Sequence, residues 1–292
     1  RIGARLIATG HTRDDQAETV LLRAARGSGW RGLAGMRALA PAPVWPAGRD
    51  VRLARPLLRT RRAALRETLF SRRATWIEDP ANTNTDFARV RARAQLGQME
   101  CAGLDPMRLA ALAERLRPHA DDLDRGALAL IETSAAFEGD LIILDLGAWR
   151  ASAVIQQRAL SVLLLAAGGG EAEPPAEQVD ALLPQLETPA FQGATLAGAW
   201  LKPERRGLVM RRDPGALSGR ADGAPPLAPL ALSPNEEAVW DRRVALTASE
   251  SGWSVSANTG APMLTRGDAR RPLTAVPVRW LIRARVTHLL AT

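Results

Sequence analysis

Cysteine, lysine and long apolar runs are scarce in this chain of 292 residues. Cys101 is the only cysteine, which excludes an internal disulfide, a zinc site made of several cysteines and a sulfur relay between two cysteines. A single cysteine fits a reducing cytoplasm, and we expect Cys101 to be a small apolar filler. No run of about 18 apolar residues occurs, so we expect no membrane span.

Lys202 is the only lysine, so arginine carries nearly all of the positive charge. The formal net charge is +8. Guanidinium groups bind phosphates through paired hydrogen bonds and stack on bases, so a nucleic acid is a candidate partner. A genome rich in G and C would also favour arginine codons. Composition leaves both explanations open.

The remaining composition is that of a folded protein, because hydrophobic residues make up 46% of the chain. Its length suffices for two or three domains. The chain starts at Arg1 without a signal-peptide pattern, and a strand pattern follows almost at once. We therefore expect the chain to begin inside a domain.

The N-terminal part predicts an α/β fold. Residues 4–9 are an apolar run that predicts a buried strand, and residues 14–26 have the apolar spacing of a helix. Thr12 and Asp15 have the spacing of a capping box at the start of that helix. A strand that leads through a polar corner into a helix is where open α/β sheets bind ligands. We expect this corner to be half of a nucleotide site.

Helices and hairpins are expected further along. A long helical pattern covers 105–136, and Pro118 should break or kink it. The other expected elements are an extended segment at 51–58, helices at 60–72, within 84–98, at 151–167 and at 176–186, and strands at 141–146, 194–201 and 207–211. Residues 213–235 have the composition of a linker, with short strands at 239–246 and 253–257 after it.

The polar corner gathers four residues that bind metals or move protons: His11, Asp14, Asp15 and Glu18. Such a set suits a hydrated Mg²⁺ on a triphosphate, because magnesium prefers oxygen ligands and keeps its waters. It also suits a metal-dependent hydrolase built from His and Asp. Acidic residues in a first helical turn equally serve the helix dipole. The residues alone leave all three explanations open.

A glycine-rich turn follows the first helix. Gly27, Ser28 and Gly29 allow the backbone to approach a phosphate or a base closely, and Arg26 adds charge. An ordinary glycine stop at a helix end would explain the same residues.

Three arginines, Arg89, Arg91 and Arg93, stand at alternate positions after an asparagine-rich turn. They suit the grip of an RNA backbone or a triphosphate. A solvated charged face would have the same pattern.

Together these segments resemble the tRNA(Ile)-lysidine synthetases, a family of the PP-loop (N-type ATP pyrophosphatase) superfamily. Residues 10–36, GHTRDDQAETVLLRAARGSGWRGLAGM, resemble the second signature segment of that family. Residues 54–58 (ARPLL) and 76–93 (WIEDPANTNTDFARVRAR) resemble its later segments, in the same order and spacing. The hairpin at 198–212, GAWLKPERRGLVMRR, is similar to part of its substrate-binding domain.

The resemblance implies an N-terminally incomplete, Rossmann-like parallel sheet of the adenine nucleotide alpha hydrolase type. A smaller, mainly helical α+β domain would follow it. We expect the PP-loop domain at 1–101, a helical tRNA-binding domain with its hairpin at 102–212, and a poorly defined region at 213–292.

The resemblance also implies a ligase reaction. ATP and Mg²⁺ would serve to adenylate the wobble cytidine of a tRNA(Ile) with a CAU anticodon, and the amino group of free L-lysine would then displace AMP to form lysidine. By this resemblance Asp15 would be catalytic and hold the metal ion, with His11 beside the nucleotide. The implied cofactor-binding residues are Arg26, Gly27, Ser28, Gly29 and Glu18, and the residues implied to contact the tRNA are Arg89 and Arg93.

Two departures from the family pattern stand out. The ATP-binding SGGxDS motif occurs nowhere in this sequence, and Val90 stands where the family usually has Asn. A tRNA cytidine thiolase of the same fold would need further cysteines. An inactive tRNA-binding remnant, or a metal hydrolase using His11, Asp14 and Asp15, would also be compatible with these residues. A homodimer is compatible with the sequence as well.

Overall fold

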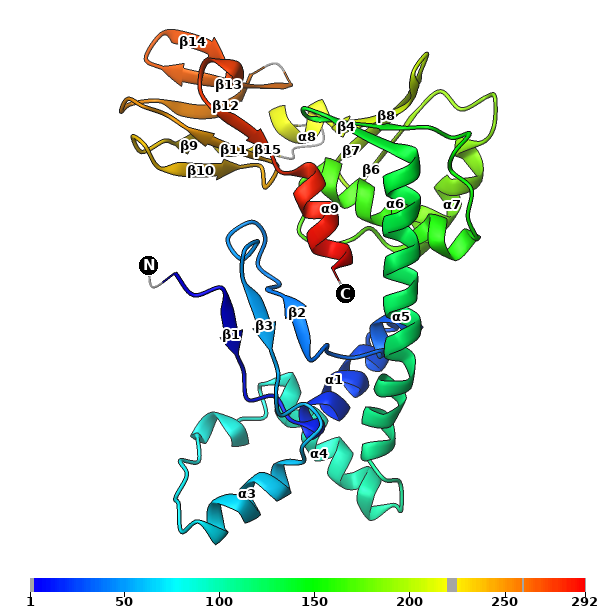
Figure 1. Ribbon diagram of the computed structural model, residues 1–292, viewed down its shortest axis with the longest axis vertical. Coiled ribbons are helices and arrows are strands. Elements are labelled where there is room, and N and C mark those ends of the chain that lie inside the picture. The colour runs from blue at the N-terminus through cyan, green and yellow to red at the C-terminus, as the bar shows by residue number, and fades with distance from the viewer. Residues whose placement is uncertain (1–2, 220–224, 259, 292) are drawn as a thin grey trace. The chain divides into compact units, whose positions relative to one another are not determined.

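Figure 1 shows a computed structural model of the chain, which describes residues 3–219, 225–258 and 260–291. The chain forms two compact units, one of residues 3–43 and 50–122 and the other of residues 44–49 and 123–291. This division differs from the boundaries expected at 101 and 212. Ile282, Val286 and Leu290 near the C-terminus belong to the same core cluster as residues 127–210. A separate core cluster lies between them in the sequence and includes Trp240 and Leu264.

The first unit contains a small mixed sheet and five helices within its described residues, the last of which continues into the second unit. The elements are β1 (Leu6–Ala8), α1 (Arg13–Ala25), α2 (Trp30–Leu33), β2 (Leu39–Pro41), β3 (Arg52–Ala54), α3 (Arg62–Ser71), a 3-10 turn (Pro80–Thr83), α4 (Ala88–Cys101) and α5 (Met107–Ser134). Cys101 is exposed at the end of α4, so the expectation of a core filler was wrong.

The sheet has the order β1-β3-β2, with β1 and β3 parallel and β2 antiparallel to β3. The protein is therefore of mixed α/β type, and one parallel pair of the expected sheet is present. The predicted strand at 4–9 exists but is not buried, because Leu6 and Ile7 are 57% and 48% exposed. An apolar run shows which side chains favour burial, whereas covering them depends on another element.

Helix α1 follows the prediction for 14–26 closely. Thr12 is its N-cap, and the capping box with Asp15 is present. Ala17 and Val20 are buried, as predicted, and Ala17 packs in one cluster with Leu96 of α4 and Ala110 of α5. The predicted face is shifted, however, because α1 also buries three polar residues: Gln16, Glu18 and Thr19.

Helix α5 runs through Pro118 without interruption, so the expected break does not occur. Proline in a helix interior removes one backbone hydrogen bond and costs roughly 3 kcal/mol. Alanines on both sides of the proline, Ala113 and Ala120, are buried, so packing along the helix offsets that cost. Within the described residues no helix is both long and apolar enough to cross a membrane.

Within its described residues, the second unit combines α5 with further helices and three sheets. The elements are β4 (Ala135–Glu138), β5 (Leu141–Leu144), α6 (Ala153–Gly168), α7 (Ala176–Leu186), β6 (Ala194–Leu196), β7 (Ala199–Glu204), β8 (Gly207–Arg212), α8 (Pro214–Ser218), β9 (Leu230–Ala231), β10 (Glu237–Trp240), β11 (Val244–Thr247), β12 (Ser254–Asn258), β13 (Ala261–Arg266), β14 (Ala269–Pro272), a 3-10 turn (Leu273–Ala275), β15 (Val278–Trp280) and α9 (Ile282–Leu290).

The largest core of this unit forms where α6 packs on the sheet β4-β5-β8-β7-β6. The hairpin predicted around 198–212 is confirmed as β7 and β8. Arg158 of α6 is buried and ion-paired with Asp124 and Glu173, each at 2.7 Å. The predicted linker contains α8 and β9, whereas its residues 220–224 lie outside the described part.

The segment 44–49 belongs to this second unit although β2 and β3 on either side of it belong to the first. Its anchor is Trp45, whose Nε1 donates a hydrogen bond of 2.7 Å to the carbonyl of Arg242. The indole ring also packs against His288, with 5.1 Å between ring centroids. Arg49 pairs with Glu237 at the other end of the segment.

Candidate active site

The candidate site begins where β1 ends and α1 begins. Thr9 ties this corner to β3, because its amide donates to the carbonyl of Ala54 at 2.9 Å. The Thr9 hydroxyl lies 2.8 Å from Nδ1 of His11. Partial burial and the nearby Arg55 lower the pKa of His11, against the opposing effect of Asp15. The imidazole is therefore neutral near pH 7 and able to accept or donate a hydrogen bond.

Asp15 is held by the helix cap. Its Oδ2 accepts hydrogen bonds from the amide and the hydroxyl of Thr12, at 2.7 and 2.6 Å. Burial by itself would raise the pKa of Asp15, but these two bonds, with Arg62 nearby, hold it below the ordinary value. Asp15 is therefore ionised throughout the physiological range, and its Oδ1 faces Arg62 at 3.2 Å.

Glu18 lies one turn further along α1 and is only 1% exposed. Its Oε1 accepts a hydrogen bond of 2.9 Å from Arg93, and Arg62 lies 3.6 Å away. The second oxygen, Oε2, is buried and has no hydrogen-bond partner within the described residues. A buried carboxylate oxygen without a donor is costly, so it marks a place where a ligand donor would be stabilised.

The four residues of the corner do not form a metal centre. Asp14 turns to the start of α3, where its Oδ2 accepts a hydrogen bond of 2.8 Å from the amide of Arg62. Across the described residues no group of three or more His, Cys, Asp or Glu side chains is placed to hold a metal ion. A hydrolase centre of His11, Asp14 and Asp15 therefore lacks its ligand set. Carboxylate oxygens such as those of Asp15 are the ligands that Mg²⁺ prefers.

The three predicted basic positions meet at one cavity. Arg26, Arg89 and Arg93 line a space of about 540 Å³ between α1 and α4, a size typical of small-ligand sites. Arg89 also lies 4.0 Å from Asp15, so the cavity adjoins the carboxylates. Arg91 points elsewhere, because it binds the carbonyls of Thr85 and Asp86.

The glycine-rich turn has a structural role that the sequence left open. Gly27 has a φ of +71°, and its amide and that of Ser28 donate to the last carbonyls of α1, at 2.9 and 3.0 Å. Gly29 is the N-cap of α2. Arg26 is thus the residue of this turn that lines the cavity, and the glycines set the path of the chain beside it.

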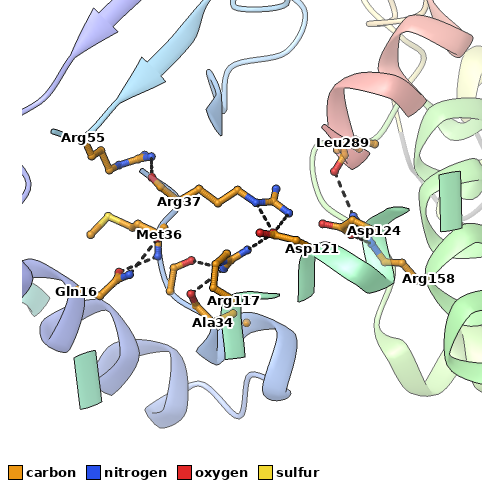
Figure 2. A network of polar contacts seen from close by, with 12 residues as sticks. Gln16, Ala34, Met36, Arg37, Arg55, Arg117, Asp121, Asp124, Arg158 and Leu289 are labelled. Atoms are coloured by element: carbon orange, nitrogen blue, oxygen red, sulfur yellow. Dashed lines mark hydrogen bonds and ion pairs between the residues drawn. The ribbon is translucent and has the colours of Figure 1, made fainter. Parts of the chain in front are cut away.

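Two residues that sequence reasoning missed complete the surroundings. Arg62 faces Asp15 and Glu18, but nothing in a run of arginines distinguishes it in the sequence. Gln16 is buried and forms two hydrogen bonds with the backbone of Met36, at 2.8 and 3.0 Å (Figure 2). Gln16 was recognisable in the sequence as a polar residue on the apolar face of α1.

Comparison with known proteins defines the class first. Residues 1–100 match a family model that is described as a PP-loop domain, so this part of the chain is similar to that family. That similarity agrees with the strand, polar corner and helix that carry His11 and Asp15.

Individual relatives are more specific, and we describe three of those that carry the name tRNA(Ile)-lysidine synthase. The protein of Hyphomonas neptunium is 38% identical over 213 residues, which cover 73% of this chain and 57% of the relative. The protein of Caulobacter vibrioides is 32% identical over 274 residues, 94% of this chain and 58% of the relative. For Mesorhizobium japonicum the values are 36% identity over 274 residues, 90% of this chain and 56% of the relative.

The similarity to tRNA(Ile)-lysidine synthases predicted from the motifs is thus confirmed. The chain spans somewhat more than half the length of these relatives.

Proposed function

We propose that this chain serves an ATP-dependent ligase that forms lysidine at the wobble cytidine of a tRNA(Ile) with a CAU anticodon. The observation that carries the proposal is the charge cluster beside the cavity of about 540 Å³. There Asp15 and the buried Glu18 face Arg62, Arg89 and Arg93. Arginines suit a triphosphate and an RNA backbone, and the carboxylates suit an attacking amine.

The reaction has two steps that conserve atoms. The carbonyl oxygen of the cytosine attacks the α-phosphorus of ATP, and pyrophosphate leaves. The uncharged amino group of free L-lysine then attacks the adenylated ring carbon, AMP leaves with that oxygen, and the nitrogen loses a proton. A Mg²⁺ ion would supply charge neutralisation on the phosphates, and Asp15 is the residue that would hold it.

The side chains around the cavity divide the work of this scheme between them. Arg26, with Gly27, Ser28 and Gly29 shaping the chain beside it, borders the nucleotide. Arg89 and Arg93 bind the tRNA or the phosphates, and neutral His11 lies beside the reacting base.

Glu18 is the candidate for positioning the lysine. Its buried Oε2 has no donor within the described residues, and an amine or ammonium group brings such donors. Lysine binding would therefore satisfy the orphaned oxygen while Arg93 keeps Oε1 in place. The tRNA substrate makes the cytoplasm the expected location.

Incorporation of labelled lysine tests the proposal. The full-length product of the gene that encodes this chain, mixed with ATP, Mg²⁺ and radiolabelled lysine, should label a tRNA(Ile) transcript with CAU. A transcript with UAU in the anticodon should stay unlabelled, because uridine at the wobble position lacks the amino group of cytidine. Absence of label from the CAU transcript would refute the proposal.

Asp15→Asn separates chemistry from binding. We expect it to lower the rate of AMP release by roughly 100-fold or more, while the dissociation constant for tRNA in a gel-shift assay stays within about threefold. Asp86→Asn is the matched control, because Asp86 is exposed and lies outside the cluster. Full turnover by Asp15→Asn would show that the role assigned to Asp15 is wrong.

A further inference from the structure

A second cavity, of about 560 Å³, lies in the first unit on the side of α1 that carries Gln16. Its walls are the segment 36–39, the residues that follow β3 at 54–59, and α5 at 113–121. The cavity therefore borders the carboxyl end of β3, the edge at which open α/β sheets bind ligands. Its volume lies in the range of roughly 300–1,000 Å³ that is typical of ligand sites.

One wall of this cavity is held rigidly. Figure 2 shows Gln16 bonded to the backbone of Met36, and Arg117 bonded to the carbonyl of Ala34. The bond that Arg117 donates is 2.7 Å long. Asp121 accepts hydrogen bonds from both Arg37 and Arg117, at 2.7 and 3.2 Å. The segment from Ala34 to Arg37 is thus fixed by side chains from α1 and α5, so the cavity is formed before any ligand arrives.

Positive charge remains in the cavity after these pairs are made. Arg55 donates from Nη1 to the carbonyl of Arg37 at 2.9 Å, but its buried Nε has no acceptor within the described residues. Arg59 is exposed, lines the same cavity and contacts no acceptor in the part of the chain that the structure describes. Two guanidinium groups that line one cavity are suited to a phosphate group.

The remaining walls suit a base. Met36, Leu39 and Pro56 present apolar atoms, and Leu39 is 41% exposed, so a flat ring would cover surface that is now in water. Glu114 adds a carboxylate whose ion pair with Arg13 is long, at 3.7 Å. A carboxylate accepts a hydrogen bond from the amino group of cytosine and repels the carbonyl of uracil at the same position.

The position of this cavity connects it to the carboxylate cluster. The charges of Arg55, at the second cavity, and of Arg89, at the first, both act on the pKa of His11, as does the charge of Asp15. Gln16 borders the second cavity and Thr19 the first, so α1, the helix that carries Asp15, borders both.

We propose that the second cavity accepts one unpaired RNA nucleotide with an amino-bearing base, its phosphate on Arg55 and Arg59 and its base over Met36, Leu39 and Pro56. Glu114 selects cytosine over uracil. Identifying this nucleotide as the wobble cytidine rests on the proposed function, whereas the site itself does not.

Photochemical crosslinking tests the location. The full-length gene product is irradiated with an anticodon stem-loop RNA of sequence CAU that carries 5-iodocytidine at the wobble position, and the crosslinked peptide is identified by mass spectrometry. We expect attachment within residues 36–39 or 54–59. Attachment within residues 82–93, at the first cavity, or in the second unit would overturn the proposal, as would the absence of binding to the stem-loop.

Two charge reversals test the phosphate contact. Arg59→Glu should weaken binding of the stem-loop by about 10-fold, whereas Arg72→Glu, an exposed arginine at the end of α3 outside the cavity, should weaken it by less than about threefold. Equal weakening by both variants would show diffuse attraction and overturn the proposal. Glu114→Gln should reduce the preference for CAU over UAU stem-loops without changing the crosslinked segment.

These measurements separate the two proposals. A crosslink within the cavity, without lysine incorporation, would refute the proposed function and leave the nucleotide site standing. Lysine incorporation with a crosslink elsewhere would refute the nucleotide site and leave the proposed function standing.

Discussion

The capping box of α1 is open to a direct test through Thr12→Val. The substitution keeps the shape of the side chain but removes the hydroxyl that donates to Asp15 at 2.6 Å and caps the helix. Loss of an N-cap costs about 1 kcal/mol, and loss of a hydrogen bond to a charged group costs roughly 1.5–3 kcal/mol. The two losses overlap, because the amide of Thr12 still donates to Asp15. We therefore expect the free energy of unfolding to fall by about 2 kcal/mol.

Urea unfolding followed by far-UV circular dichroism measures this change. With a slope of roughly 2 kcal/mol per molar urea, the midpoint should fall by about 1 M. Thr68→Val is the matched control, because the Thr68 hydroxyl bonds to a carbonyl within an exposed turn of α3 and caps nothing. Its effect should stay within about 0.5 kcal/mol. A midpoint for Thr12→Val equal to that of Thr68→Val would refute the reasoning.

The pH dependence adds a second check on the same variant. The pKa of Asp15 lies below its ordinary value of 3.8 in the folded protein, so its ionised form stabilises the fold above that pH. This contribution is lost as the pH falls through the folded pKa. The stability difference between the wild type and Thr12→Val should therefore narrow below about pH 4. A difference that widens there would contradict the assigned hydrogen bonds.

Three further variants test the structure elsewhere. Gly35→Ala should lower the free energy of unfolding in urea by about 2 kcal/mol, because φ is +67° and the new Cβ would lie 2.7 Å from Gln16 Oε1. Gly97→Ala is the control and should not lower it, because the space around Gly97 is open. Trp45→Phe should cost about 1 kcal/mol and increase hydrogen exchange in 44–49, and unchanged exchange would contradict the anchor. Arg93→Met should cost about 2 kcal/mol, because buried Glu18 loses its hydrogen bond and keeps only the longer contact with Arg62, and most of that loss should be recovered when Glu18→Gln is added.

Local features of the site were readable from the sequence. The capping box at Thr12 and Asp15 was predictable because a cap depends on residues three positions apart. The strand and helix on either side of His11 were predictable for the same reason, since their periodicity lies within a few turns of chain. The resemblance to tRNA(Ile)-lysidine synthetases also rested on contiguous segments.

Exposure was less predictable than secondary structure. Leu6 and Ile7 form the predicted strand yet stay exposed, and Glu18 and Gln16 are buried on a helix whose apolar face seemed to exclude them. Pro118 failed to end α5, because packing from distant segments outweighed a local penalty. In each case the outcome depended on what lies opposite the residue, which local sequence does not contain.

The sequence by itself determined that Asp15 lies in the first turn of a capped helix after a strand, because that arrangement follows from spacing along the chain. Only the tertiary structure decided which arginines matter: Arg93 reaches Glu18 across 75 positions, Arg62 faces two carboxylates, and Arg91 turns to its own loop. Their sequence environments are alike. Their roles differ because charge pairing in a partly buried site depends on distance and burial, which the fold alone sets.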